Sequence, residues 1–161
     1  MDLKRLLEKA RELEKIQAML YKGLADKFPS LGEISQFWSG MAEDEKGHYE
    51  RIVKMYDELK TEQLSAEIDS NLYDFVCKGL NELKPSLLNR IADLHDAFEL
   101  AHEVENYETQ AVFKFVHVRF RNDPHELDVC KSMLAHLDKL SSFSDRFSSA
   151  GERKRIKATR K

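Results

Sequence analysis

The stretch "MAEDEKGHYERI", residues 41–52, places an acidic residue three positions before a histidine within a long pattern of helical spacing. Residues three apart lie on one face of a helix, so Glu45 and His48 point in the same direction. Apolar residues at steps of three and four share that face, and they are Ile34, Trp38, Met41, Ile52, Met55 and Leu59. The pair therefore faces the interior, where a carboxylate must be paired, protonated or bound to a metal.

Each expected helix has a row of apolar residues along one face, which we call its seam. Polar residues interrupt the seams of three other helices in the way that Glu45 and His48 interrupt this one. These helices are expected at about residues 3–28, 86–120 and 125–147, with the helix around Glu45 at about 31–60. Glu14 lies mid-seam in the first helix, and Glu105 and Glu108 lie on adjacent turns of the third. His136 interrupts the fourth. Four long helices with polar residues near the middle of each seam predict an all-α four-helix bundle with a shared polar site in its core.

The chain also has two similar halves. The segment "ARELEKIQA", residues 10–18, aligns with "AHEVENYET", residues 101–109, and the following helices align as well. This alignment sets Glu14 opposite Glu105 and His48 opposite His136.

Between the halves, residues 61–84 contain an amphipathic stretch around Leu72, Phe75, Val76, Leu80 and Leu83. The pattern predicts a short helix within a long crossover between the second and third helices. Such a connection would let the second half return alongside the first.

The composition is typical of a single helical domain in a reducing compartment. The 161 residues are 42% hydrophobic and 34% charged, which is enough for one domain with a real core. The two cysteines form no CxxC pair, so neither a disulfide framework nor a cysteine zinc site is expected. The charged start resembles no secretory signal, and no apolar run is long enough to cross a bilayer. We therefore expect a cytoplasmic protein with no membrane partner.

Charge is distributed unevenly along the chain. Residues 151–161 hold six basic residues and one acidic residue, a net charge of +5, which leaves −8 on the rest of a chain whose net charge is −3. An acidic body argues against a nucleic-acid-binding domain. The basic segment has no aromatic residue that could stack on bases. We predict a bundle domain at 1–148 and a solvated, flexible basic tail at 149–161.

Several of these residues together resemble a known family. Glu14 with Tyr21 seven positions on, the stretch "AEDEKGHYE" and the stretch "AFELAHEVE", which carries Glu105, resemble the rubrerythrin branch of the ferritin-like superfamily. The resemblance covers most of the chain up to the tail. It implies a ferritin-like bundle with a di-iron carboxylate site. The cysteine knuckles of the rubredoxin-type module are missing.

The resemblance also implies a set of metal ligands. Glu14 and Glu105 would be terminal ligands, and Glu45 with His48 would supply a bridging carboxylate and a terminal imidazole, with His136 as the second imidazole. Carboxylates neutralise divalent cations and change their binding mode as iron changes oxidation state. Iron is the expected metal, one or two ions, with zinc or manganese as possible substitutes.

The fourth helix departs from the family pattern. "MLAH" stands where ExxH is expected, so Met133 occupies the second bridging position, and a thioether is a poor ligand for iron. Some rubrerythrin-like sites use an additional acid on the third helix, so Glu108 is the candidate replacement. Gln17 and Tyr21 are expected beside the ligands, without binding the metal themselves.

The expected function is a rubrerythrin-like iron protein that reduces peroxide or oxidises ferrous iron. It would use an external electron-donor protein, and the family type suggests a homodimer. Two alternatives stay open: iron storage, which requires a cage, and a non-enzymatic bundle that binds metal without turnover. In a metal-free form of the latter, the core acids, histidines and Gln17 would form a hydrogen-bonded network that fixes helix register.

Overall fold

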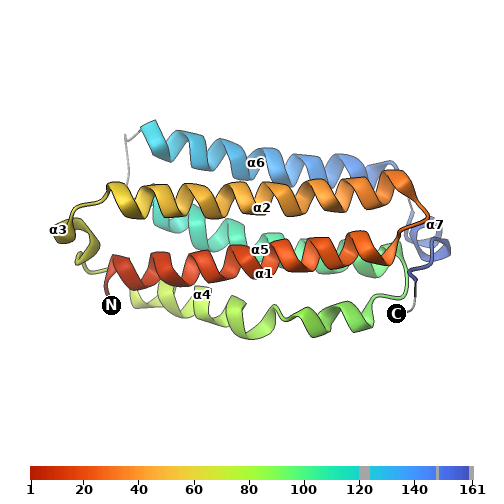
Figure 1. The fold of residues 1–161 in the computed structure, drawn as a ribbon, viewed down its shortest axis with the longest axis horizontal. Helices are drawn as coiled ribbons and strands as arrows, with labels where there is room; N and C mark the ends of the chain where they lie inside the picture. The colour runs from red at the N-terminus through yellow and green to blue at the C-terminus, as the bar shows by residue number, and fades with distance from the viewer. Residues whose placement is uncertain (120–123, 148, 160–161) are drawn as a thin grey trace.

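The computed structural model describes residues 1–119, 124–147 and 149–159, with side chains described outside 108–130 and 132–134. Long helices lie side by side along the long axis, as Figure 1 shows. The predicted all-α bundle is confirmed. Within the described residues, none of the helices combines the length and the apolarity needed to span a lipid bilayer.

The first half is an antiparallel helix pair, α1 (Leu3–Lys27) and α2 (Gly32–Glu58). Asp2 begins α1 as its N-cap, because its side chain accepts a hydrogen bond from the Arg5 backbone nitrogen at 3.0 Å. The helix ends just before Phe28 and Pro29, since the residue before a proline disfavours the helical conformation. A short turn then reverses the chain, so mid-helix residues of α1 and α2 face each other.

The crossover runs the length of the bundle. After α2, the chain forms the short helix α3 (Thr61–Leu64) and then α4 (Ser70–Glu82), which lies beside α1 (Figure 1). The helix predicted in the crossover is therefore confirmed. Because α4 returns the chain to the opposite end, α5 (Leu94–Arg119) runs in the same direction as α2, and α6 (Pro124–Asp145) runs in the direction of α1.

The third long helix begins later than the sequence predicted. A start near residue 86 was expected, but a 3₁₀ helix occupies Pro85–Arg90 and α5 begins at Leu94. The cause is Asp93, whose Oδ1 accepts hydrogen bonds from the backbone nitrogens of His95 at 3.0 Å and Asp96 at 3.2 Å. A side-chain acceptor at this position fixes a helix start.

Part of the basic tail, predicted from the sequence as a solvated extension, is hydrogen-bonded to the bundle through its backbone. Ser149 caps α7 (Ala150–Arg155), and the residues after it pair with the start of α5. The backbone oxygen of Ile156 accepts from Leu94 at 2.9 Å, and the backbone nitrogen of Thr159 donates to Lys27 at 2.7 Å. Sequence patterns missed this packing because charged side chains dominate a segment that is held through its backbone.

Where side chains are described, the apolar seams predicted from the sequence face a common core. The seam of α2 is buried from Ile34 to Ile52, while Met55 and Leu59 are partly buried against it. An aromatic cluster fills the half of the core towards α7. Its ring contacts join Trp38 to Tyr21, Phe37 and Phe98, and Phe37 to Phe143. Polar side chains interrupt this core at mid-length, where the sequence predicted a shared site.

Candidate metal centre

Five ionisable side chains meet in the middle of the bundle. Glu14 comes from α1, Glu45 and His48 from α2, Glu105 from α5 and His136 from α6. All five are buried, with exposures from 0% for Glu45 to 6% for His48. Acidic and imidazole groups are seldom fully buried unless they are paired or coordinate a metal. The structure thus brings together residues that lie more than a hundred positions apart in the sequence, as the seams predicted.

On the first half, a histidine and a glutamate of the same helix contact each other. His48 Nδ1 lies 3.0 Å from Glu45 Oε2, at hydrogen-bond distance. The same nitrogen lies 3.7 Å from Glu14 Oε2. The spacing of three residues along α2 makes the first contact local, and the antiparallel packing of α1 supplies the second.

The second half supplies a histidine that reaches across to other helices. His136 Nδ1 lies 3.4 Å from Glu105 Oε2 and 3.8 Å from Glu45 Oε1. Its ring centroid is 5.4 Å from that of His48, with the two rings nearly perpendicular at 81°. Glu45 therefore turns one carboxylate oxygen to each histidine and occupies the middle of the group.

Two neutral side chains of α1 border this group. Tyr21 donates a hydrogen bond from its hydroxyl to Glu105 Oε1, which leaves the other oxygen of Glu105 towards His136. Gln17 donates from Nε2 to the backbone oxygen of Val104 at 3.3 Å. Both side chains are buried, at 0% exposure. The structure thus brings Tyr21 into contact with a candidate ligand and bonds Gln17 to the residue of α5 that precedes Glu105.

The chemistry of these donors suits a divalent metal. Glu45, His48 and His136 each offer one ligand atom, and the three atoms lie within 4.8 Å of one another. Carboxylate oxygens and imidazole nitrogens are ligands used for iron, zinc and manganese. A cation here would also offset the burial of several carboxylates in one small volume. The residues present therefore fit a metal centre.

Two residues of the predicted site fall where the structure describes no side chain. Glu108 is part of α5 and Met133 is part of α6, but their side chains lie outside the described residues. That Glu108 supplies the carboxylate missing at Met133 thus stays a prediction.

The structure adds a surface ion pair that sequence reasoning missed. Asp44 Oδ2 lies 3.8 Å from His136 Nε2, on the far side of that ring from Glu105, and 2.6 Å from Lys139 Nζ. The side chains of Asp44 and Lys139 are about two-fifths exposed, at 42% and 39%. They lie off the apolar seams, so periodicity gives no signal for them.

The remaining described histidines belong to other surroundings. His102 is exposed on α5, and His95 is half-buried near the start of that helix, beside the Asp93 cap. Neither belongs to the group of candidate ligands.

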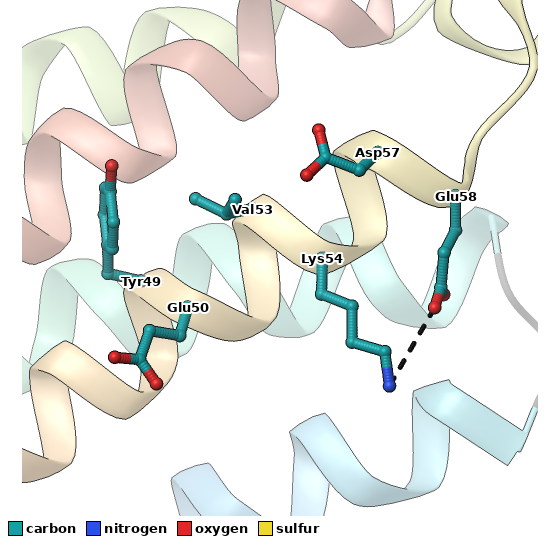
Figure 2. A pocket seen from close by; sticks show the side chains of 6 residues that line it. All are labelled: Tyr49, Glu50, Val53, Lys54, Asp57 and Glu58. Atoms are coloured by element: carbon teal, nitrogen blue, oxygen red, sulfur yellow. Dashed lines mark ion pairs between the residues drawn. The ribbon is translucent and has the colours of Figure 1, made fainter.

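A separate groove lies on the outer face of α2. It has a volume of about 440 Å³, and it is lined by Tyr49, Glu50, Val53, Lys54, Asp57 and Glu58. Figure 2 shows Tyr49 pointing towards α1, where Lys15 Nζ lies 4.9 Å from its ring centroid, and Lys54 pointing towards Glu58 at 3.8 Å. Small-molecule sites are mostly apolar with a few convergent polar groups, whereas four of these six residues are charged. The groove is a solvated helix face.

Fold and site together define a class of protein. Helical bundles build metal sites in their cores from carboxylates and imidazoles on facing helices. This chain has that arrangement at the middle of its long helices. The family model described as Rubrerythrin matches residues 5–118, and the chain belongs to the rubrerythrin family. This membership, with the buried group, supports a di-iron carboxylate protein. Comparison with curated proteins found no match, and comparison with solved structures found none either.

The extent of the family match has a consequence for the site. Residues 5–118 include Glu14, Glu45, His48 and Glu105 but end before α6. The place of His136 in the group therefore rests on geometry, through its contacts with Glu105 and Glu45.

Proposed function

We propose that the chain is a rubrerythrin-like non-haem iron protein that binds two iron ions in its core and reduces hydrogen peroxide or oxidises ferrous iron. The proposal places the protein in the cytoplasm, as a homodimer that receives electrons from a separate donor protein. It assigns Glu14, Glu45, His48, Glu105 and His136 as metal ligands, with Glu108 as the sixth.

One observation carries the proposal. Glu45 is fully buried, and its two oxygens face two different histidines, 3.0 Å from His48 and 3.8 Å from His136. Glu45, His48 and His136 would hold a metal here, and the buried carboxylate would offset part of the charge of the bound cations.

The protein's own residues would orient and shield such a centre. Bound iron would supply the change between ferrous and ferric states. The hydroxyl of Tyr21 holds one oxygen of Glu105, which fixes the direction of the other. The stacked ring of Trp38, at a centroid distance of 6.0 Å from Tyr21, helps to close the core to water on the α7 side.

A turnover experiment tests the proposed reaction. Anaerobically loaded ferrous protein should be oxidised by hydrogen peroxide and, once a reductant is supplied, should consume peroxide repeatedly. The variants His48→Ala and Glu105→Ala should lose most of this turnover, whereas His102→Ala, on the exposed face of α5, should retain it.

Three results would contradict the proposal in different ways. Turnover that persists in both core variants would indicate free iron in solution. A single oxidation without turnover would indicate a metal-binding scaffold. Failure of the natural protein to take up iron would favour the metal-free hydrogen-bonded network, for which the Glu45–His48 and Tyr21–Glu105 contacts are the supporting observations.

A further inference from the structure

Gln17 has a buried side-chain amide whose nitrogen is hydrogen-bonded and whose oxygen has no partner among the described residues. Its side chain has 0% exposure, and its Nε2 donates to the backbone oxygen of Val104 at 3.3 Å. Its Oε1 is buried and has no hydrogen-bond partner among the residues that the structure describes. A buried acceptor without a partner destabilises a protein by about 1–3 kcal/mol, so its presence in the core requires a reason.

The orientation of this amide is determined by its partner. A backbone carbonyl is only an acceptor, so the end of the amide that faces Val104 must be the NH₂ group. The reversed orientation would bring two acceptor oxygens together. The end that remains open is therefore the carbonyl oxygen, and what it lacks is a donor.

Helical spacing places Gln17 at the level of the candidate metal centre. It lies three residues after Glu14, which contacts His48, and four residues before Tyr21, which contacts Glu105. Its bonded partner, Val104, directly precedes Glu105 in α5. The carboxylates of this layer are acceptors when ionised and cannot satisfy another acceptor. A suitable donor is an O–H group of a small molecule that enters the site.

We propose that Gln17 Oε1 is the hydrogen-bond acceptor for hydrogen peroxide in the core site, and that it distinguishes peroxide from dioxygen. Hydrogen peroxide has O–H groups to donate, whereas dioxygen has none. This assignment rests on the proposed function. Water shares the same donor chemistry, so the experiment must separate the role of an ordered water from recognition of peroxide.

The experiment compares two oxidants and two positions. Gln17→Met and Gln17→Leu remove the acceptor with side chains of similar size, and Leu20→Met is the control, since Leu20 is fully buried on the same helix. Each ferrous protein is mixed in stopped flow with hydrogen peroxide and, separately, with dioxygen. Both Gln17 variants should react with peroxide roughly tenfold more slowly and with dioxygen at a nearly unchanged rate, as expected for one lost hydrogen bond. Leu20→Met should change neither rate.

Two measurements without turnover accompany the kinetics. Cobaltous titration of the Gln17 variants should give the stoichiometry of the natural protein, and the melting temperature of their metal-free forms should change little, because removal of a buried unsatisfied oxygen offsets the loss of the hydrogen bond from Nε2 to Val104. Loss of a metal ion would make Gln17 a ligand and overturn the proposal. A melting temperature lowered by more than about 5 °C, beyond what the one lost hydrogen bond to Val104 explains, would also overturn it, since Oε1 would then be satisfied without a ligand.

The kinetic outcomes distinguish a failure of the Gln17 assignment from a failure of the proposed function. A natural protein whose ferrous form does not react with peroxide overturns both. A natural protein that reacts, with Gln17 variants whose peroxide-to-dioxygen rate ratio is unchanged, overturns the Gln17 assignment alone. This second result would indicate that Oε1 holds a structural water.

Discussion

The two halves of the bundle bring unequal parts to the same site. In the first half, His48 contacts a glutamate of its own helix, Glu45, at 3.0 Å. In the second half, Met133 stands at the equivalent position, three residues before His136. His136 instead contacts Glu105 of α5 and Glu45 of α2, at 3.4 and 3.8 Å.

This difference shows that the contribution of α6 to the site depends on its packing against other helices, whereas that of α2 does not. The α2 pair is set by local helical spacing, so it exists wherever α2 is folded. The position of His136 is set only when α6 packs on α2 and α5. A duplicated fold can thus lose ligand symmetry in one half while the other half keeps the central carboxylate in place.

The largest expected effect comes from removing the self-contained pair of the first half. Zinc or ferrous ion at about a thousand times its dissociation constant should stabilise the natural protein by about 4 kcal/mol, or about 10 °C in melting temperature. The double variant Glu45→Ala, His48→Ala should lose this shift. The neighbouring exposed pair His102→Ala, Glu103→Ala should keep it. An equal shift in the core variant would mean that the metal binds elsewhere.

The asymmetry itself is tested at Met133. With one carboxylate fewer in the second half, the second ion should bind about tenfold or more weakly than the first, because fewer anionic oxygens offset the repulsion between two cations. Met133→Glu should tighten the weak position, and Glu108→Ala should loosen it further. Stepwise cobaltous titration of the three proteins measures this. Equal affinities in the natural protein, unaffected by Glu108→Ala, would show that another residue completes the site.

The buried polar residues of both halves could largely be predicted from the sequence. Periodicity marks which side chains face the core, and a buried polar residue interrupts an apolar seam visibly, as Glu14, Glu45 and His136 do. The contact between Asp44 and His136 could not be predicted, because it joins two helices through an exposed side chain.

Helix starts and backbone pairing were also beyond the sequence pattern. The start of α5 depends on the Asp93 cap, which competes with a helical pattern that continues upstream. The packing of residues 156–159 depends on backbone hydrogen bonds, which carry no side-chain signature.

An effect smaller than the metal-induced shift is expected from the C-terminal residues 156–161, which contact both halves through their backbone. Removing residues 156–161 deletes the backbone acceptor of Leu94, at the start of α5, and the backbone donors to Ala92 and to Lys27, at the end of α1. We expect a loss of about 3 kcal/mol in the free energy of unfolding, at about 1 kcal/mol for each of the three hydrogen bonds. Urea unfolding measures it. The double variant Lys154→Ala, Arg155→Ala keeps the backbone and should change stability by less than about 0.5 kcal/mol. Similar losses in both would assign the effect to charge.

The smallest effect concerns a second tyrosine–glutamate pair, which joins the crossover to the second half. Tyr107 of α5 donates its hydroxyl to Glu82 of α4, much as Tyr21 of α1 donates to Glu105. Burial, followed by the hydrogen bond to Glu82 and the charge of that carboxylate, raises the pKa of Tyr107 from 10.0 to about 12. The folded protein therefore holds this proton more tightly than the unfolded chain does.

The sign of the pH dependence follows from the raised pKa of Tyr107. Its contribution is complete below pH 10.0 and is lost as the pH rises to about 12. Tyr107→Phe has no proton to lose, so its stability should fall less over this window. The difference should be about 1 kcal/mol, smaller than a full two-unit shift implies, because the Glu82 side chain is 45% exposed and water screens its charge. Glu82→Gln removes the charge but keeps an acceptor, so its curve should lie between the other two. Urea unfolding at several pH values across this window measures these free energies. If stability falls equally with pH in the natural protein and in Tyr107→Phe, the contact with Glu82 does not raise the pKa of Tyr107.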